Sequence, residues 1–198
     1  MKEIGMLFSG PMVRAILDGR KTQTRRIARD CRIDSNGNAW QGKRNFGRDE
    51  GDQPNIDRWK SPCNVGDHIY VRETWSYLYF DHNTKKQFYY YKADYPDFER
   101  GFTPDGWDSR PPAAGGDRWY PSIHMPKAAA RIWLEVTDVR PERLLDISSH
   151  DANCEGFTEA GTHPRAEFLA AWNQLYGYGA AEADPLVWVI EFKQIEVK

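Results

Sequence analysis

The chain has 198 residues, of which 40% are hydrophobic and 14% aromatic, and its formal net charge is −2. At a prior of ~150 residues per domain this length fits one domain with insertions, and the apolar content is enough to bury a core. The small negative charge excludes a generally basic nucleic-acid coat, so any contact with nucleic acid must come from a local patch.

Cysteine and histidine spacing gives no sign of a disulfide framework or a metal site. Cys31, Cys63 and Cys154 form no C-x-x-C pair, and the five histidines show neither H-E-x-x-H nor H-x-H spacing. We therefore expect no metal and no cofactor. No apolar stretch approaches the ~20 residues of a membrane span, and the first apolar run is too short for a secretory signal. We expect a cytoplasmic protein that does not enter a membrane; its oligomeric state is left open.

The first elements along the chain are predicted to be a strand, a short helix and a second strand. An apolar run over 4–8 is typical of a buried strand. Pro11 follows serine and glycine, which is a helix-entry signal because proline is tolerated in the first turn. Apolar residues at helical spacing predict a helix over 11–18, which Gly19 ends. Alternating threonines over 21–27 favour a strand.

The middle of the chain is predicted to hold two strands between two long irregular insertions. Residues 30–62 and 94–121 show little periodicity and are rich in residues that favour turns, so we interpret both as surface insertions. Between them, alternating patterns predict strands over 68–75 and 88–93.

The C-terminal part begins with the clearest alternation, over 130–139, which predicts a strand. A serine N-cap at 148–149 predicts a helix that stops at Gly156, and a second helix is expected to end at Gly177. The last strand is predicted over 186–195. Strands outnumber helices and do not alternate as βαβ units, which predicts an α+β fold: a mostly antiparallel β-barrel with peripheral short helices.

The strongest local charge lies between Arg14 and Arg32, where seven cations stand against two anions. Such a patch attracts phosphate or another anion. On composition alone the same segment could be a solvated basic edge of a polar strand, so its meaning depends on the pattern within it.

Residues 19–26 read G-x-K-x-x-T-x-R. This pattern resembles the signature G-x-K-x-x-[E/T]-x-R of the ASCH family of PUA-like β-barrels. The segment LDISSHDANCEG at 145–156 resembles a family helix that ends in E-G. The turn at 65–67, the segment VRETW at 71–75 and the closing strand at 187–192 are also similar, and the whole is similar to ASCH proteins of phages and prophages. Neither insertion is covered.

The resemblance implies one ASCH domain over 1–198, with a cleft that handles a nucleoside, RNA or modified nucleic acid. The threonine variant of the signature is similar to small bacterial amidohydrolases that deacetylate 4-N-acetylcytidine. Carried over by motif position, Lys21 would be the base, Thr24 the nucleophile and Glu155 an assisting carboxylate. The alternatives are a phosphate-binding lysine, an ordinary strand threonine and a glutamate that only ends a helix.

Four further residues are candidates for binding the substrate. Arg25 and Arg26 belong to the signature segment and could contact an anion or the acyl oxygen. Glu73 could be an inward carboxylate that lines the cleft or an exposed residue of the strand. Trp75 could stack on a base, an interaction worth ~1–3 kcal/mol, or pack in the core.

Two other functions remain open. A non-catalytic module that binds RNA or modified nucleic acid would use the same basic segment, because a shared fold does not establish a shared reaction. Ribonuclease activity, which the resemblance to the wider ASCH group also allows, has less support because no histidine pair lies near the signature. The small deacetylases also lack the two insertions.

Overall fold

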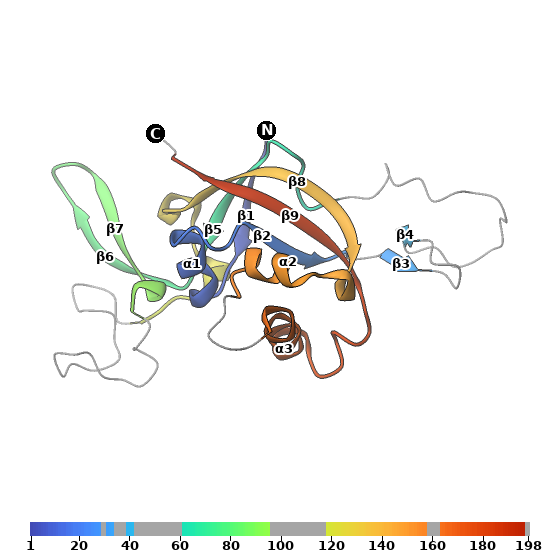
Figure 1. The fold of residues 1–198 in the computed structure, drawn as a ribbon. Coiled ribbons are helices and arrows are strands. Elements are labelled where there is room, and N and C mark those ends of the chain that lie inside the picture. The colour runs from blue at the N-terminus through green and yellow to red at the C-terminus, as the bar shows by residue number, and fades with distance from the viewer. Residues whose placement is uncertain (29–30, 34–38, 42–60, 96–117, 158–162, 197–198) are drawn as a thin grey trace. The chain divides into compact units, whose positions relative to one another are not determined.

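The computed structural model describes residues 1–28, 31–33, 39–41, 61–95, 118–157 and 163–196 (Figure 1). Most of the two insertions predicted over 30–62 and 94–121 therefore lies outside the described residues. The chain divides into two compact units, each built from separate stretches of sequence. The first unit comprises Met1–Lys21, Gly66–Glu135 and Lys193–Lys198, and the second comprises Thr22–Val65 and Val136–Phe192.

The first unit is built on strands that bury an aliphatic core. Its main elements are β1 (Glu3–Leu7), α1 (Gly10–Leu17), β5 (His68–Arg72), β6 (Trp75–Asp81), β7 (Lys86–Tyr91), the turn η2 (Lys92–Asp94) and the start of β8 (Trp133–Arg143). β1 runs parallel to β5, and β5 pairs antiparallel with β8. β6 and β7 form an antiparallel hairpin, green in Figure 1. Ile69, Val71 and Leu134 are buried.

Helix α1 forms close to its predicted place, for the predicted reasons. Pro11 occupies the first turn, and Val13 and Ile16 face the core. Gly19 has a φ of +72°, a left-handed conformation that glycine adopts without steric cost, and it ends the helix. The chain then turns into β2 (Gln23–Ile27), which forms within the predicted strand.

The prediction of a single strand over 68–75 is wrong in its C-terminal bound. β5 ends at Arg72, and Trp75 begins a separate strand, β6, instead of continuing β5. The backbone N–H of Glu73 donates to the sulfur of Met125 at 3.2 Å. Its carboxylate is held by Arg131. Because these long-range partners bind Glu73, it does not pair in the sheet. The alternating sequence pattern therefore continues past the end of the strand.

The second unit combines a sheet with two helices. Its elements are β2, β3 (Cys31–Ile33), β4 (Ala39–Gln41), the rest of β8, η6 (Leu144–Asp146), α2 (Ser149–Cys154), α3 (Pro164–Tyr176) and most of β9 (Leu186–Ile195). β9 pairs with β2 antiparallel, and Thr24 stands opposite Ile190. β3 pairs antiparallel with β4. Phe168 and Trp172 of α3 pack in one cluster with Val187 and Val189 of β9.

The predicted α+β class, with mostly antiparallel strands and short helices, is confirmed. Helices α2 and α3 occupy their predicted places, and β9 has its predicted bounds. The pairings of the described strands do not close into a barrel, but they are compatible with the predicted PUA-like barrel. No helix in the described part of the chain is long and apolar enough to cross a membrane.

Candidate active site

The residues of the G-x-K-x-x-T-x-R segment are polar but buried. Lys21, Thr24 and Arg25 are each 2% exposed or less, and Glu155 is 3% exposed. Charged side chains are almost never fully buried unless they are paired, because leaving water costs free energy. These residues are therefore not a solvated basic edge. The remainder of the segment differs, since Arg20 is exposed and pairs with Asp18.

Backbone hydrogen bonds fix the start of β2 against α2 and β9 within the second unit. The N–H of Thr22 donates to the carbonyl oxygen of Cys154 at 2.8 Å, and the N–H of Phe192 donates to the carbonyl oxygen of Thr22 at 2.9 Å. Cys154 is the last residue of α2 and precedes Glu155. The strand that carries Thr24 is thus joined directly to the helix end that carries Glu155.

Local signals at both ends of α2 hold Glu155 in place. The Ser148 hydroxyl accepts the N–H of Asp151 at 3.0 Å, and the Asp151 carboxylate accepts the N–H of Ser148 at 3.2 Å, which is a capping box. At the other end the N–H of Glu155 donates to the carbonyl oxygen of Asp151 at 2.8 Å. Gly156 follows with a φ of +97° and ends the helix.

Arg25 lies in a buried ionic cluster. Its Nη1 is 3.3 Å from Oε1 of Glu155, and its Nη2 is 3.0 Å from Oε2 of Glu142 and 3.7 Å from Oδ2 of Asp151. Burial opposes ionisation of Asp151, but hydrogen bonds with Ser148 and the charge of Arg25 outweigh it and lower the pKa of Asp151. Arg25, predicted to bind substrate, is thus surrounded by acidic side chains and holds Glu155.

Side chains of a strand alternate between its faces, so Gln23 and Arg25 share one face of β2 while Thr24 and Arg26 share the other. In agreement, Gln23 Nε2 donates to the carbonyl oxygen of Asp151 at 2.8 Å, on the side of the ionic cluster. Burial lowers the pKa of Arg26, although interactions with Tyr176 and the charge of Glu155 oppose this shift.

Glu73 is a buried carboxylate of the first unit. It is 1% exposed and forms a two-pronged ion pair with Arg131, at 2.9 Å between Nε and Oε1 and 3.0 Å between Nη2 and Oε2. Burial raises the pKa of Glu73, and the hydrogen bonds and charge of Arg131 reduce this shift. Arg131 also bonds both carboxylate oxygens of Asp94 and lies over the ring of Tyr91, 4.0 Å from its centroid.

Trp75, the other binding candidate in the first unit, occupies a core position. It is 2% exposed and stacks on Tyr120 with ring centroids 5.1 Å apart. Tyr77 and Tyr89 approach it edge-on, at 4.8 and 5.6 Å. Neighbouring rings therefore occupy the surfaces on which a base would have to stack.

The chain is similar to a solved ASCH domain. That domain, from Lactobacillus crispatus JV V101, is 12% identical in sequence, with a TM-score of 0.44 over 98% of this chain and 79% of that one. No protein-family model and no curated protein matches the chain.

Sequence reasoning missed the acidic partners of Arg25. Asp151 could have been found, because a serine followed three residues later by an acidic residue is a capping signal that places both at a helix start. Glu142 carries no such signal, because it lies 117 residues from Arg25 along the chain. Among the described residues, no group of His, Cys, Asp and Glu side chains is arranged to hold a metal ion.

Proposed function

We propose that this chain is an ASCH-type amidohydrolase that removes an acyl group from the exocyclic amine of a cytosine nucleoside, with 4-N-acetylcytidine as the model substrate. One observation carries the proposal: Lys21, Thr24 and Glu155, the motif positions associated with that reaction, are all 3% exposed or less. An ammonium, a hydroxyl and a carboxylate are costly to bury, so their burial at matching positions supports a chemical role.

Chain connectivity also favours a shared site for these residues. Lys21 and Thr24 are three positions apart, so their Cα atoms lie within about 11 Å of each other in any conformation. Thr22, next to Lys21, bonds through its N–H to Cys154, next to Glu155. Both links run through the backbone, so the support that they give to a shared site does not depend on side-chain rotamers.

In the proposed reaction, the Thr24 hydroxyl oxygen attacks the acetyl carbonyl carbon and its proton passes to the neutral amine of Lys21. The carbon–nitrogen bond then breaks, its electron pair goes to the cytosine amine, and Glu155 relays the proton from Lys21 to that amine. Water hydrolyses the acetyl-threonine, which releases acetate and restores the hydroxyl. The electron-poor cytosine ring makes this amine a better leaving group than that of a peptide.

The arginines take supporting roles in this proposal. The guanidinium of Arg26, on the same face of β2 as Thr24, donates to the carbonyl oxygen as it becomes negative. Arg25 is a positioning residue, because it contacts Glu155 at 3.3 Å and is itself fully covered. Since Thr24 is 1% exposed, the side chains that cover it must move before a nucleoside can reach it.

The test is hydrolysis of 4-N-acetylcytidine by the full chain, followed as release of cytidine by chromatography. Thr24→Val keeps the shape of the side chain and removes the hydroxyl. Thr22→Ala is the matched control, because Thr22 is exposed and its hydrogen bonds with Cys154 and Phe192 use only the backbone. We expect turnover that Thr24→Val abolishes and Thr22→Ala preserves, and a decrease of about 10²–10⁴-fold for Lys21→Met.

A folded wild-type chain that leaves 4-N-acetylcytidine intact would overturn the deacetylase proposal. Unmodified RNA, incubated in parallel, separates the remaining functions. Degradation of this RNA would indicate a ribonuclease. Binding that weakens steeply with salt, without any product, would indicate a nucleic-acid binding module.

A further inference from the structure

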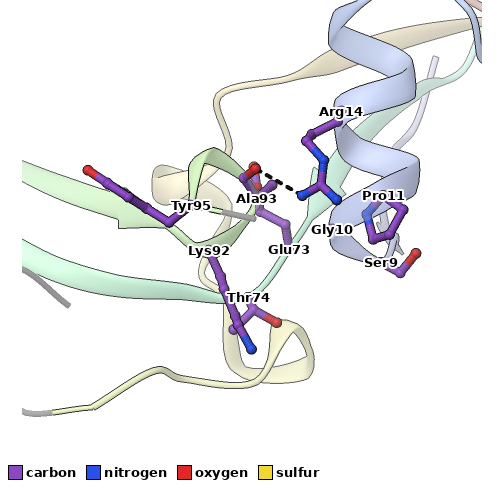
Figure 2. Close-up of a pocket in the computed structure, with 9 residues that line it drawn as sticks. All are labelled: Ser9, Gly10, Pro11, Arg14, Glu73, Thr74, Lys92, Ala93 and Tyr95. Carbon is purple, nitrogen blue, oxygen red and sulfur yellow. Dashed lines mark hydrogen bonds between the residues drawn. The ribbon is translucent and has the colours of Figure 1, made fainter. Parts of the chain in front are cut away.

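A pocket of about 270 Å³ lies within the first unit, where the start of α1 faces η2 (Figure 2). Ligand pockets for small molecules usually measure ~300–1,000 Å³. This volume is slightly smaller, so it suits a compact group such as a phosphate with part of a sugar. The proposed hydrolysis makes no use of this pocket.

Two cationic side chains, from two different elements, line the pocket. Arg14 extends from α1, and its Nη1 donates to the carbonyl oxygen of Ala93 at 3.1 Å, the dashed line in Figure 2. A guanidinium has five N–H donors, so others remain for a ligand. Lys92 extends from η2 beside Thr74 (Figure 2). Within the described residues, the ammonium of Lys92 has neither an ion-pair partner nor a hydrogen-bond acceptor.

The carboxylate that lines the pocket does not cancel this charge. Glu73 forms a bidentate ion pair with Arg131, which also pairs with Asp94, so these three groups together carry a net charge of −1. Together with the positive charges of Arg14 and Lys92, the charged groups in and behind the lining sum to +1, so the pocket still favours an anion.

Neutral donors complete the lining. Ser9 is the N-cap of α1, but its side chain makes no capping hydrogen bond, and the first turn holds no acidic residue. Its hydroxyl and that of Thr74 are therefore available to an anion. The positive end of the helix dipole adds to the attraction. A helix start alone would not make a site, but here it combines with two cations in a pocket.

We propose that this pocket binds the phosphate group of a nucleotide, with Arg14 and Lys92 as charged donors and the hydroxyls of Ser9 and Thr74 as neutral ones. Tyr95 also lines the pocket, and its ring extends away from Arg14 and Lys92 in Figure 2. The proposal goes beyond the hydrolysis of an acyl group and does not depend on it.

The test measures binding of inorganic phosphate and of cytidine 5′-monophosphate to the full chain by calorimetry and by NMR. We expect saturable binding, with chemical-shift changes at α1 and η2. Lys92→Gln should weaken it by about tenfold or more, as for loss of a charged hydrogen-bond donor. Lys86→Gln is the matched control, because it removes the same charge from an exposed position on β7 outside the pocket.

Arg14→Gln tests the second cation, but Arg14 also tethers Ala93 and its variant can lose structure, so the judgement rests on Lys92. Equal affinity in wild type and Lys92→Gln, equal losses in Lys92→Gln and Lys86→Gln, or no saturable phosphate binding would each overturn the proposal. The source of the phosphate is distinguished by competition. A short RNA without terminal phosphates displaces cytidine 5′-monophosphate only if the pocket also takes backbone phosphates.

Discussion

Arg25 places a full positive charge where no part of its side chain reaches solvent. Its Nε has no hydrogen-bond partner among the described residues, so its attachment depends on the carboxylates of Glu142, Asp151 and Glu155. Removing one partner of a buried ion pair leaves the opposite charges uncompensated, which is more costly than losing an exposed pair.

We therefore expect Arg25→Met to lower the free energy of unfolding by about 3–5 kcal/mol, the range for broken buried ion pairs. Arg20→Met is the control, because Arg20 pairs with Asp18 at the surface, and such pairs contribute about 1 kcal/mol or less. Urea unfolding of both variants measures the difference. Similar losses in the two variants would show that the cluster around Arg25 is not what stabilises it.

Glu73 makes stability depend on pH, because burial raises its pKa above the ordinary value of 4.5. A carboxyl group with a raised pKa binds its proton more tightly in the folded chain. Its contribution to stability is therefore complete below the unfolded pKa and is lost as pH rises through the folded pKa. Glu73→Gln cannot titrate.

The stability of wild type relative to Glu73→Gln should thus fall as the pH is raised from about 4 through the folded pKa. Urea unfolding at a series of pH values gives this difference directly. If the stability difference between wild type and Glu73→Gln stays constant or grows with pH, burial does not outweigh the ion pair with Arg131 in shifting the pKa of Glu73.

At the scale of elements, α2 connects a local capping signal to the candidate site. Ser148→Ala removes the hydroxyl that accepts the N–H of Asp151, and loss of such a cap costs about 0.5–2 kcal/mol. Because Glu155 directly follows the last residue of α2 as its C-cap, we also expect a lower rate of hydrolysis. Ser149→Ala, one position further into the helix and exposed, should change stability by no more than about 0.5 kcal/mol.

The bounds of elements that depend on neighbouring residues were predictable from the sequence. The bounds that depend on partners far along the chain were not. Ser148 and Gly156 bound α2, and both act within a few residues. By contrast, β5 stops before Glu73 because Arg131 and Met125 bind this residue from 58 and 52 positions away. No periodicity in the sequence records such contacts, so one predicted strand became β5 and β6.

The same distinction applies to the candidate site. The signature at 19–26 pointed to Lys21 and Thr24, and the segment at 145–156 pointed to Glu155; all three residues are buried. The pattern could not show that Arg25 is enclosed by acidic partners, because Glu142 reaches it from another strand. A motif names candidate residues, but only the folded structure shows which of their side chains a ligand can reach.

At the scale of the whole molecule, two strands belong to both compact units. β8 contributes Trp133–Glu135 to the first unit and residues 136–143 to the second, and β9 is divided after Phe192. If one unit unfolds, its part of β8 and β9 unfolds with it, and the same strands are then cut short in the other unit. We therefore propose that the chain is one cooperative domain despite its two units, and small single domains usually unfold in one transition.

Hydrogen exchange monitored by mass spectrometry tests this proposal. The most protected amides of β5, in the first unit, and of β2, in the second, should exchange with the same free energy of opening, equal to that of global unfolding. Arg25→Met should lower both values equally, although Arg25 belongs to the second unit. If that variant weakens protection in β2 while β5 keeps its wild-type value, the units open independently, and the molecule is better described as two domains that share strands.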